Sequence, residues 1–170
     1  MTHSTPLPAT PTDAPATAGR PTGPAALAAA LTGRTDLWAH RVEFRAESRW
    51  THLLDTAALT RALDGALDAA LSAELTGAQA WLLSWLPGPV TPLHDHGASA
   101  GAFAVARTAD LAAGRVRAFG RHHVHQVVNT LHEPAVSLHV YAPRLTLVNT
   151  YRVDERRLVR TGTEQAGVDW

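Results

Sequence analysis

Histidine is the residue type whose number and spacing in this sequence could do chemistry. The chain has 10 histidines, and several of them gather in two clusters, His94-Asp95-His96 and His122-His123-Val124-His125. In a β-strand the side chains of residues i and i+2 point to the same face, so His94 and His96 could approach one ion together. A third histidine from a facing strand would close a three-nitrogen site that keeps positions open for other ligands. The two clusters therefore predict a metal site.

The second cluster offers two candidates for the third ligand. Strand alternation puts His123 and His125 on one face and His122 on the other, so alternation alone does not choose between the first two. The chain has no cysteine, which excludes a thiolate nucleophile and any metal site built on cysteine. The metal chemistry must therefore rest on histidine or carboxylate ligands.

Three further polar residues alternate along one predicted strand. Ser137, His139 and Tyr141 occupy every second position, so their side chains point to one face, which we expect to be the interior of a barrel. They could form a hydrogen-bonded relay that ends in a phenol. The alternative is that three half-polar side chains only satisfy one another inside the barrel.

The elements that must position these residues follow from composition and periodicity. With 170 residues, 45% of them hydrophobic, the chain can form one domain, which we expect over residues 25–170 after a disordered Pro-, Thr- and Ala-rich tail at 1–24. Residues 25–40 predict one or two short helices. Leucines spaced by four from Leu59 to Leu75 predict an amphipathic helix over residues 56–76 that ends at Gly77. Strands are expected at residues 42–54, 80–86, 101–106, 115–119, 123–129, 135–141 and 145–153.

Charge and hydropathy limit the partners. The 15 basic and 15 acidic residues cancel, so no basic surface argues for nucleic acid or for membrane lipid. No apolar run has the length of a membrane span, and the N-terminus lacks the pattern of a signal peptide. We therefore expect a cytoplasmic protein that acts on a small molecule, as a monomer or a homodimer.

Three motifs resemble the signatures of the cysteine dioxygenase family, a branch of the cupins. They are Trp85-Leu86-Pro87-Gly88, His94-Asp95-His96-Gly97 and Ser137-Leu138-His139-Val140-Tyr141-Ala142-Pro143, and the resemblance covers roughly residues 37–151. It implies a mainly β fold, a cupin-type jelly-roll β-barrel with N-terminal helices and an inserted amphipathic helix at 56–76. The second cupin motif has its histidine four residues before an asparagine, here Asn129, and this register selects His125.

The resemblance also implies an activity. His94, His96 and His125 would hold Fe(II), while Ser137, His139 and Tyr141 would act beside the metal, with the Tyr141 hydroxyl orienting the substrate. The reaction would be the oxidation of a small thiol such as cysteine by O2 to its sulfinic acid. Two alternatives remain: another cupin metalloenzyme that uses Mn, Ni or Zn, and a non-catalytic, degenerate cupin that binds a ligand or partner.

The sequence departs from the family at several places. Gly101 stands near the position where some members carry a cysteine that is crosslinked to the tyrosine. Aligning Arg49-Trp50-Thr51-His52 with the strand that bears the family's carboxylate-binding arginine puts His52 at that position and turns Arg49 to the other face, so His52 is the expected substrate-binding residue. Only 28 residues separate His96 from His125, which predicts that the hairpin between the two motifs is largely absent.

Overall fold

The structure is a computed structural model that describes residues 22–46, 48–88, 90–107, 115–130 and 132–166. Its main element is a five-stranded antiparallel sheet with the order β1-β2-β6-β4-β5. These strands are β1 (Trp50–Leu53), β2 (Gln79–Trp85), β6 (Ala135–Ala142), β4 (Ala100–Arg107) and β5 (Val116–Phe119). A smaller antiparallel sheet has the order β3-β7-β8, formed by β3 (Leu93–Asp95), β7 (Leu147–Asp154) and β8 (Arg157–Gln165). The predicted mainly β fold with N-terminal helices is confirmed, and two antiparallel sheets fit the expected jelly roll, although the hydrogen bonds between described residues do not close the two sheets into a continuous barrel.

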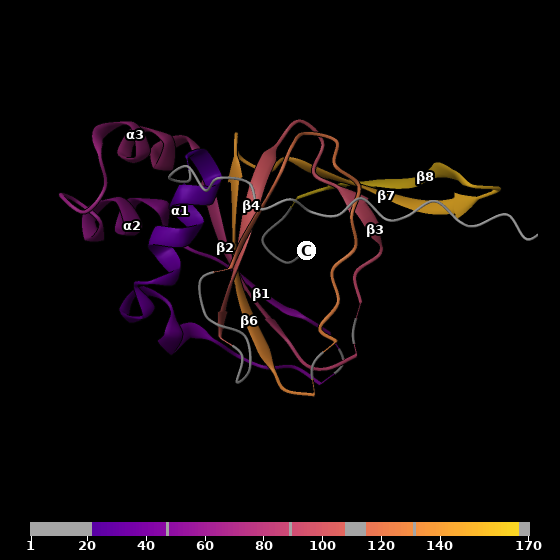
Figure 1. Ribbon diagram of the computed structural model, residues 1–170, viewed down its shortest axis with the longest axis horizontal. Coiled ribbons are helices and arrows are strands. Elements are labelled where there is room, and N and C mark those ends of the chain that lie inside the picture. The colour runs from indigo at the N-terminus through magenta and orange to yellow at the C-terminus, as the bar shows by residue number, and fades with distance from the viewer. Residues whose placement is uncertain (1–21, 47, 89, 108–114, 131, 167–170) are drawn as a thin grey trace, which may run out of the picture.

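Strand alternation gives the large sheet two different faces. On the outer face, a core that includes Trp50, Leu82 and Leu138 packs against the helices, and α1 (Gly23–Thr32) lies across β4 and β6. On the inner face, a second cluster that includes Trp81 and Tyr141 packs against residues at the start of β7. Figure 1 shows α1, α2 and α3 together on one side of the sheet, with β3 and the β7–β8 hairpin on the other side. The inner face is the one that the predicted relay residues share.

The leucine-rich segment forms two helices, so the prediction of one continuous helix over residues 56–76 is wrong. The helix α2 (Thr56–Ala62) begins at Asp55, whose side chain accepts hydrogen bonds from the backbone of Ala57 and Ala58. A turn with Gly65 at φ +74 follows, and Asp68 then caps α3 (Ala69–Gly77). A left-handed glycine and a new N-cap end one helix and start another, whereas a leucine at every fourth position suits both helices equally. Leu59, Leu63 and Leu75 remain buried, as the periodicity predicted.

The segment around the second histidine cluster differs from its prediction. Residues 123–129 form no named strand; isolated bridges at His94↔His125 and Val90↔Val128 hold this segment in place. Between His96 and His125 the chain forms the two predicted strands β4 and β5, which pair in antiparallel fashion. The missing hairpin was expected between these two strands, at residues 108–114, which lie outside the described residues. The predicted strands at 80–86, 101–106, 115–119, 135–141 and 145–153 lie within a few residues of β2, β4, β5, β6 and β7. Of the strand predicted at 42–54 only β1 is formed, and β8 was not predicted.

Helices form in the N-terminal part, as predicted for residues 25–40. Residues 1–21 of the predicted tail lie outside the described residues, and α1 begins at Gly23, within the predicted tail at 1–24. Two short 3-10 helices, η1 (Thr35–Leu37) and η2 (Ala39–Arg41), follow α1 after Gly33. None of the described helices has both the length and the apolar character needed to cross a membrane.

Candidate metal centre

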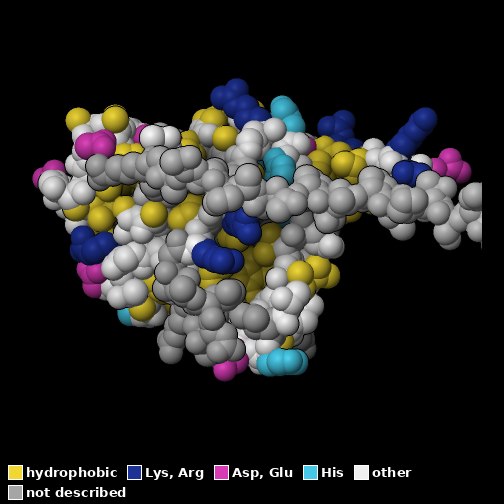
Figure 2. Space-filling model, in the orientation of Figure 1, with side chains coloured by type: hydrophobic (Ala, Val, Ile, Leu, Met, Phe, Trp, Pro, Cys, Tyr) yellow, Lys and Arg dark blue, Asp and Glu magenta, His cyan; other side chains and the backbone are white. Residues whose placement is uncertain are grey.

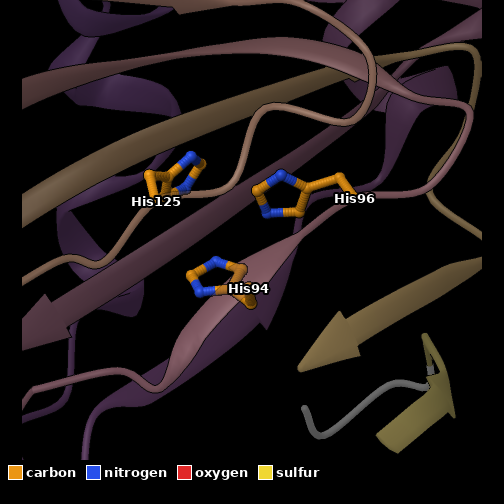
Figure 3. Close-up of side chains that lie close together, drawn as sticks. All are labelled: His94, His96 and His125. Carbon is orange, nitrogen blue, oxygen red and sulfur yellow. The ribbon is translucent and has the colours of Figure 1, made fainter. Parts of the chain in front are cut away.

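Three histidines converge at the junction between β3 and the segment that follows β5. One nitrogen from each of His94, His96 and His125 lies within 4.8 Å of the others. Figure 3 shows the three rings turned toward one another, two from the β3 region and one from the neighbouring segment. These are the three ligands that the resemblance implied, and among the described residues they form a group that could hold a metal ion.

Backbone hydrogen bonds fix the distance between the two histidine segments. The His94 N–H donates to the His125 carbonyl and the His125 N–H donates to the His94 carbonyl, each at 2.9 Å. The His94 ring is fixed as well, because its Nδ1 lies 2.8 Å from the Pro92 carbonyl and must donate to it. The neutral His94 ring therefore presents an unprotonated Nε2, which is the form that binds a metal.

Asp95 points to the opposite side of β3 and is not a ligand. Its carboxylate accepts hydrogen bonds from Gly97 N at 2.8 Å, from Asn149 Nδ2 at 2.8 Å and from Tyr151 Oη at 2.7 Å. Asp95 therefore ties the two-histidine segment to β7, and the candidate site formed by the described residues has three nitrogens and no carboxylate. Sequence reasoning did not identify this anchor, although strand alternation between His94 and His96 already turns Asp95 away from the ion.

Burial keeps the three rings neutral. Desolvation, followed by the influence of the neighbouring histidines, lowers the pKa of His96 to about 2 and that of His125 to about 4. Burial also lowers the pKa of His94. Imidazole binds a metal through a neutral nitrogen, so the electrostatics of the site suit a cation rather than bound protons.

The predicted relay residues lie in hydrogen-bonding contact on the inner face of β6. The indole N–H of Trp85 donates to Ser137 Oγ at 2.9 Å, and Ser137 Oγ lies 2.9 Å from His139 Nε2. Tyr141 Oη lies 3.4 Å from His139 Nδ1 and 3.3 Å from His96 Nε2. A chain of hydrogen-bonding contacts therefore runs from Trp85 of β2, through the three relay residues of β6, to the candidate metal ligand His96. Trp85 was not among the predicted site residues.

Aromatic rings cover the histidines from the side of β4 and β5. Phe119 stacks on His96 with ring centroids 5.1 Å apart, and Phe103 stacks on His139 at 5.3 Å. A Cβ at Gly101 would lie 2.7 Å from the Phe119 ring, so the ring occupies the space that a side chain at this position would need. Gly101 also lies opposite Tyr141 in the β4–β6 register. An aromatic ring thus packs where some family members carry the crosslinking cysteine.

The structure separates His52 from the site and brings Arg49 to it. The His52 ring stacks on that of Trp50 on the outer face, with ring centroids 5.5 Å apart. Burial is the main cause that lowers the pKa of His52, and the charges of Arg41 and Glu43 have smaller effects. Arg49 is half-buried on the other side of the chain, and its positive charge acts on His94, His139 and Tyr141. The expected placement of His52 beside the metal is therefore wrong. Counting alternation from Trp50 and Leu54, two large apolar residues that belong to the outer core, would have placed Arg49 on the inner face.

Stability of the metal-free protein should fall at acidic pH. Burial, followed by nearby positive groups, lowers the pKa of His139 to about 3 from its usual 6.5, so the folded chain resists a proton that the unfolded chain accepts. Between these two values the free energy of unfolding should decrease as the pH falls, by about 1.4 kcal/mol per pH unit for each such histidine. Chemical denaturation at a series of pH values, on chelator-treated protein, measures the slope.

One variant assigns part of that slope to a buried ring. His139→Gln should remove about one proton from the difference between the unfolded and folded states, so its slope should be shallower than that of the parent protein. An equal slope in the variant and the parent protein would contradict the assignment.

Comparison with known proteins gives one family and several distant structures. Residues 105–156 match the family described as cysteine dioxygenase type I. No curated protein matches the chain. The solved structures include a protein from Thermus thermophilus, with 19% identity over 62% of this chain and 93% of that chain and a TM-score of 0.45. A sugar phosphate isomerase of the cupin superfamily from Silicibacter pomeroyi has 23% identity over 59% of this chain and 73% of that chain, with a TM-score of 0.40. An oxalate decarboxylase from Bacillus subtilis has 16% identity over 66% of this chain and 30% of that chain, also with a TM-score of 0.40.

The matched residues include His125 from the metal group and all three residues of the relay, Ser137, His139 and Tyr141. The resemblance that the motifs predicted is thereby confirmed for residues 105–156, the part of the chain that is similar to cysteine dioxygenase type I.

Proposed function

We propose that this protein is an Fe(II)-dependent thiol dioxygenase, which oxidises a small thiol with O2 to the sulfinic acid. The observation that carries the proposal is the Tyr141 hydroxyl, placed 3.3 Å from His96 at the end of a buried relay and beside a three-histidine group without a carboxylate. The match of residues 105–156 to cysteine dioxygenase type I supports it. The reaction balances as R–SH + O2 → R–SO2H, with both oxygen atoms transferred to sulfur.

The donor set fits a divalent metal ion. Histidine nitrogens lie about 2.0–2.1 Å from a bound zinc ion, so nitrogens that share an ion of this kind lie up to about 4.2 Å apart. The three candidate nitrogens lie within 4.8 Å of one another, and small ring movements are enough to close them on one ion. Iron bound by His94, His96 and His125 would supply the thiolate-binding and redox chemistry, and the all-nitrogen set leaves its positive charge undiminished by a ligand carboxylate.

The relay keeps a proton in place on Tyr141. An indole N–H is only a donor, so Ser137 accepts from Trp85 and can direct its own hydrogen to His139 Nε2. Neutral His139 then carries its proton on Nδ1 and donates it to Tyr141 Oη. The Tyr141 hydroxyl hydrogen is left to point at the reacting groups, and burial raises the pKa of this phenol above its usual value, so it remains a donor at neutral pH.

Arg49 supplies the charge that a thiolate or carboxylate requires. Its guanidinium is half-buried, and its charge acts on His94, His139 and Tyr141, while Glu164 is the acid whose charge acts on Arg49. A cation in this position favours an anion beside the metal ligands. Arg49 therefore takes the role of substrate-binding residue that the sequence assigned to His52.

Metal analysis and oxygen uptake test the proposal together. Purified protein should contain iron, and iron-loaded protein should consume O2 with at least one of cysteine, 3-mercaptopropionate or cysteamine, with the sulfinic acid as product by mass spectrometry. Iron-loaded protein that consumes no O2 with any thiol would contradict the dioxygenase proposal. Stoichiometric Mn, Ni or Zn with no iron would instead favour another cupin metalloenzyme, since imidazole ligands do not by themselves select iron.

Arg49→Gln should raise the KM for a thiol acid by about tenfold or more and change kcat less. The reason is that a charge-assisted interaction with the substrate contributes about 1.5–3 kcal/mol, while the metal ligands and the relay remain intact. Steady-state oxygen uptake with 3-mercaptopropionate measures both constants. His52→Gln is the matched control, because His52 lies on the outer face and should leave both constants unchanged. A KM change in His52→Gln and none in Arg49→Gln would reverse the assignment.

A further inference from the structure

A cavity extends from the metal centre along the inner face of the large sheet. Its volume is about 580 Å³, and His125 and Ser137 form part of its wall, so it is continuous with the proposed reaction site. Clefts that bind drug-sized ligands measure roughly 300–1,000 Å³. A three-carbon thiol acid such as 3-mercaptopropionate would fill only a small part of this space.

The wall of the cavity is mostly apolar, with one arginine and no acid among its described residues. Trp85, Phe103, Val105, Phe119 and Val127 supply hydrophobic surface, and Arg117 is the arginine in the wall. Figure 2 shows a hollow on this face with hydrophobic side chains inside it and basic side chains at its edge; the chain has no lysine, so they are arginines. Such a wall favours a ligand with an apolar body and an anionic group.

The register of β5 sets the order of these features. Phe119 touches the ligand rings, with its centroid 5.0 Å from that of His125. Arg117 lies two residues earlier on the same face of the strand, about 7 Å farther along, and opposite Phe103 in the β4–β5 register. A molecule with its sulfur at the metal would therefore meet aromatic rings first and the guanidinium of Arg117 at its far end.

We propose that the substrate is a thiol with a larger apolar body, such as a chain of five or six carbons or an aromatic ring, and with an acidic group at the end far from sulfur. The apolar body lies along Phe119, Phe103 and Val105, and Arg117 binds the terminal carboxylate. This inference rests on the proposed thiol oxidation at the same site, and the sulfur atom is oxidised there as written above.

A series of mercapto acids tests the substrate class by binding rather than by turnover. Isothermal titration of the full chain under argon, iron-loaded and metal-free, compares 3-mercaptopropionate, 4-mercaptobutyrate and 6-mercaptohexanoate. Each buried methylene should lower the Kd by about fourfold, because its transfer from water contributes about 0.8 kcal/mol. The gain in affinity with chain length should appear in both the iron-loaded and the metal-free protein, since it comes from the cavity and not from the metal. A Kd that does not fall with chain length in either form would overturn the inference.

Two variants separate the apolar wall from the charged end. Arg117→Gln should weaken 6-mercaptohexanoate about tenfold and leave 6-mercaptohexanol unchanged, whereas Arg121→Gln, at an exposed residue outside the cavity wall, should affect neither. Val105→Phe should fill the cavity and remove the gain in affinity with chain length. Equal effects of Arg117→Gln on the acid and the alcohol would overturn the role of Arg117.

The proposed function and this inference fail in different experiments. If the long mercapto acids bind as expected but iron-loaded protein oxidises no thiol, the dioxygenase proposal is wrong and the cavity remains a binding site for apolar acids. If cysteine is oxidised but chain length has no effect on binding, the activity stands and the inference on substrate size is wrong.

Discussion

His125→Ala should lose its metal, and His123→Ala should keep it. The two residues lie in one segment with ring centroids 5.4 Å apart, and strand alternation alone did not distinguish them. Only His125 has a nitrogen within 4.8 Å of those of both His94 and His96, while the exposed His123 lies at the cavity wall. Loss of a residue that merely supports a ligand costs about 10–100-fold in metal affinity, so loss of a ligand itself should cost more than about 100-fold.

Metal content after dialysis and a competitive chelator titration measure this difference. His96→Ala should behave like His125→Ala, because each removes one of three nitrogens from the same ion. Unfolding curves of the metal-free variants verify that the loss is local, since the His94–His125 backbone hydrogen bonds do not depend on either side chain. Stoichiometric metal in His125→Ala, or its loss in His123→Ala, would show that the ligand set is wrong.

The metal ligands could be predicted from sequence because they depend on short-range geometry. Two histidines at i and i+2 share a face of any strand, and Ser137, His139 and Tyr141 do so for the same reason. The third ligand comes from a segment that forms no named strand and is joined to Val90 and His94 by isolated bridges, and such a segment has no periodic pattern of its own. The choice of His125 over His123 therefore required the spacing of the second cupin motif, in which the histidine lies four residues before an asparagine, here Asn129.

Arg49 and His52 show how an alignment made without a structure can assign side chains to the wrong face of a sheet. A shift of one or three residues moves a side chain to the opposite face of a sheet, and the motif alignment was off by such a shift. The outer-core residues Trp50 and Leu54 carried the correct parity, since both pack against the helices. Burial of large apolar residues on one face is thus a better guide to strand facing than a distant match between polar residues.

The helix break in the inserted segment was missed because it leaves no mark on the periodicity. A turn at Gly65 leaves the leucine spacing unchanged, so periodicity cannot detect it. The strands β4 and β5, by contrast, could be predicted from short strand-like runs bounded by turn residues. β5 carries Phe119 and Arg117, which shape the cavity, yet the sequence alone assigned neither residue to the site.

Tyr141→Phe should retain iron and lose most of its turnover. The substitution removes only the hydroxyl that lies between His139 and His96, and the three ligand nitrogens stay in place. A positioned proton donor typically contributes 10²–10⁴-fold, so we expect kcat for thiol oxidation to fall by about 100-fold at unchanged iron content. Stopped-flow or electrode measurement of oxygen uptake at saturating thiol, with iron determined on the same sample, gives the ratio.

The chain's other tyrosine is the matched control, because Tyr151 also carries a hydrogen-bonding role but points away from the ion. Its hydroxyl donates to Asp95, which anchors the two-histidine segment to β7. Tyr151→Phe should therefore weaken iron binding by about 10–100-fold and leave kcat near that of the parent protein once iron is saturating. The two variants thus separate a group that acts on the reaction from one that acts on the metal. If Tyr141→Phe lowered iron content and Tyr151→Phe lowered kcat, the relay would be a support for the ligands, and the role of Tyr141 in the proposed reaction would be lost.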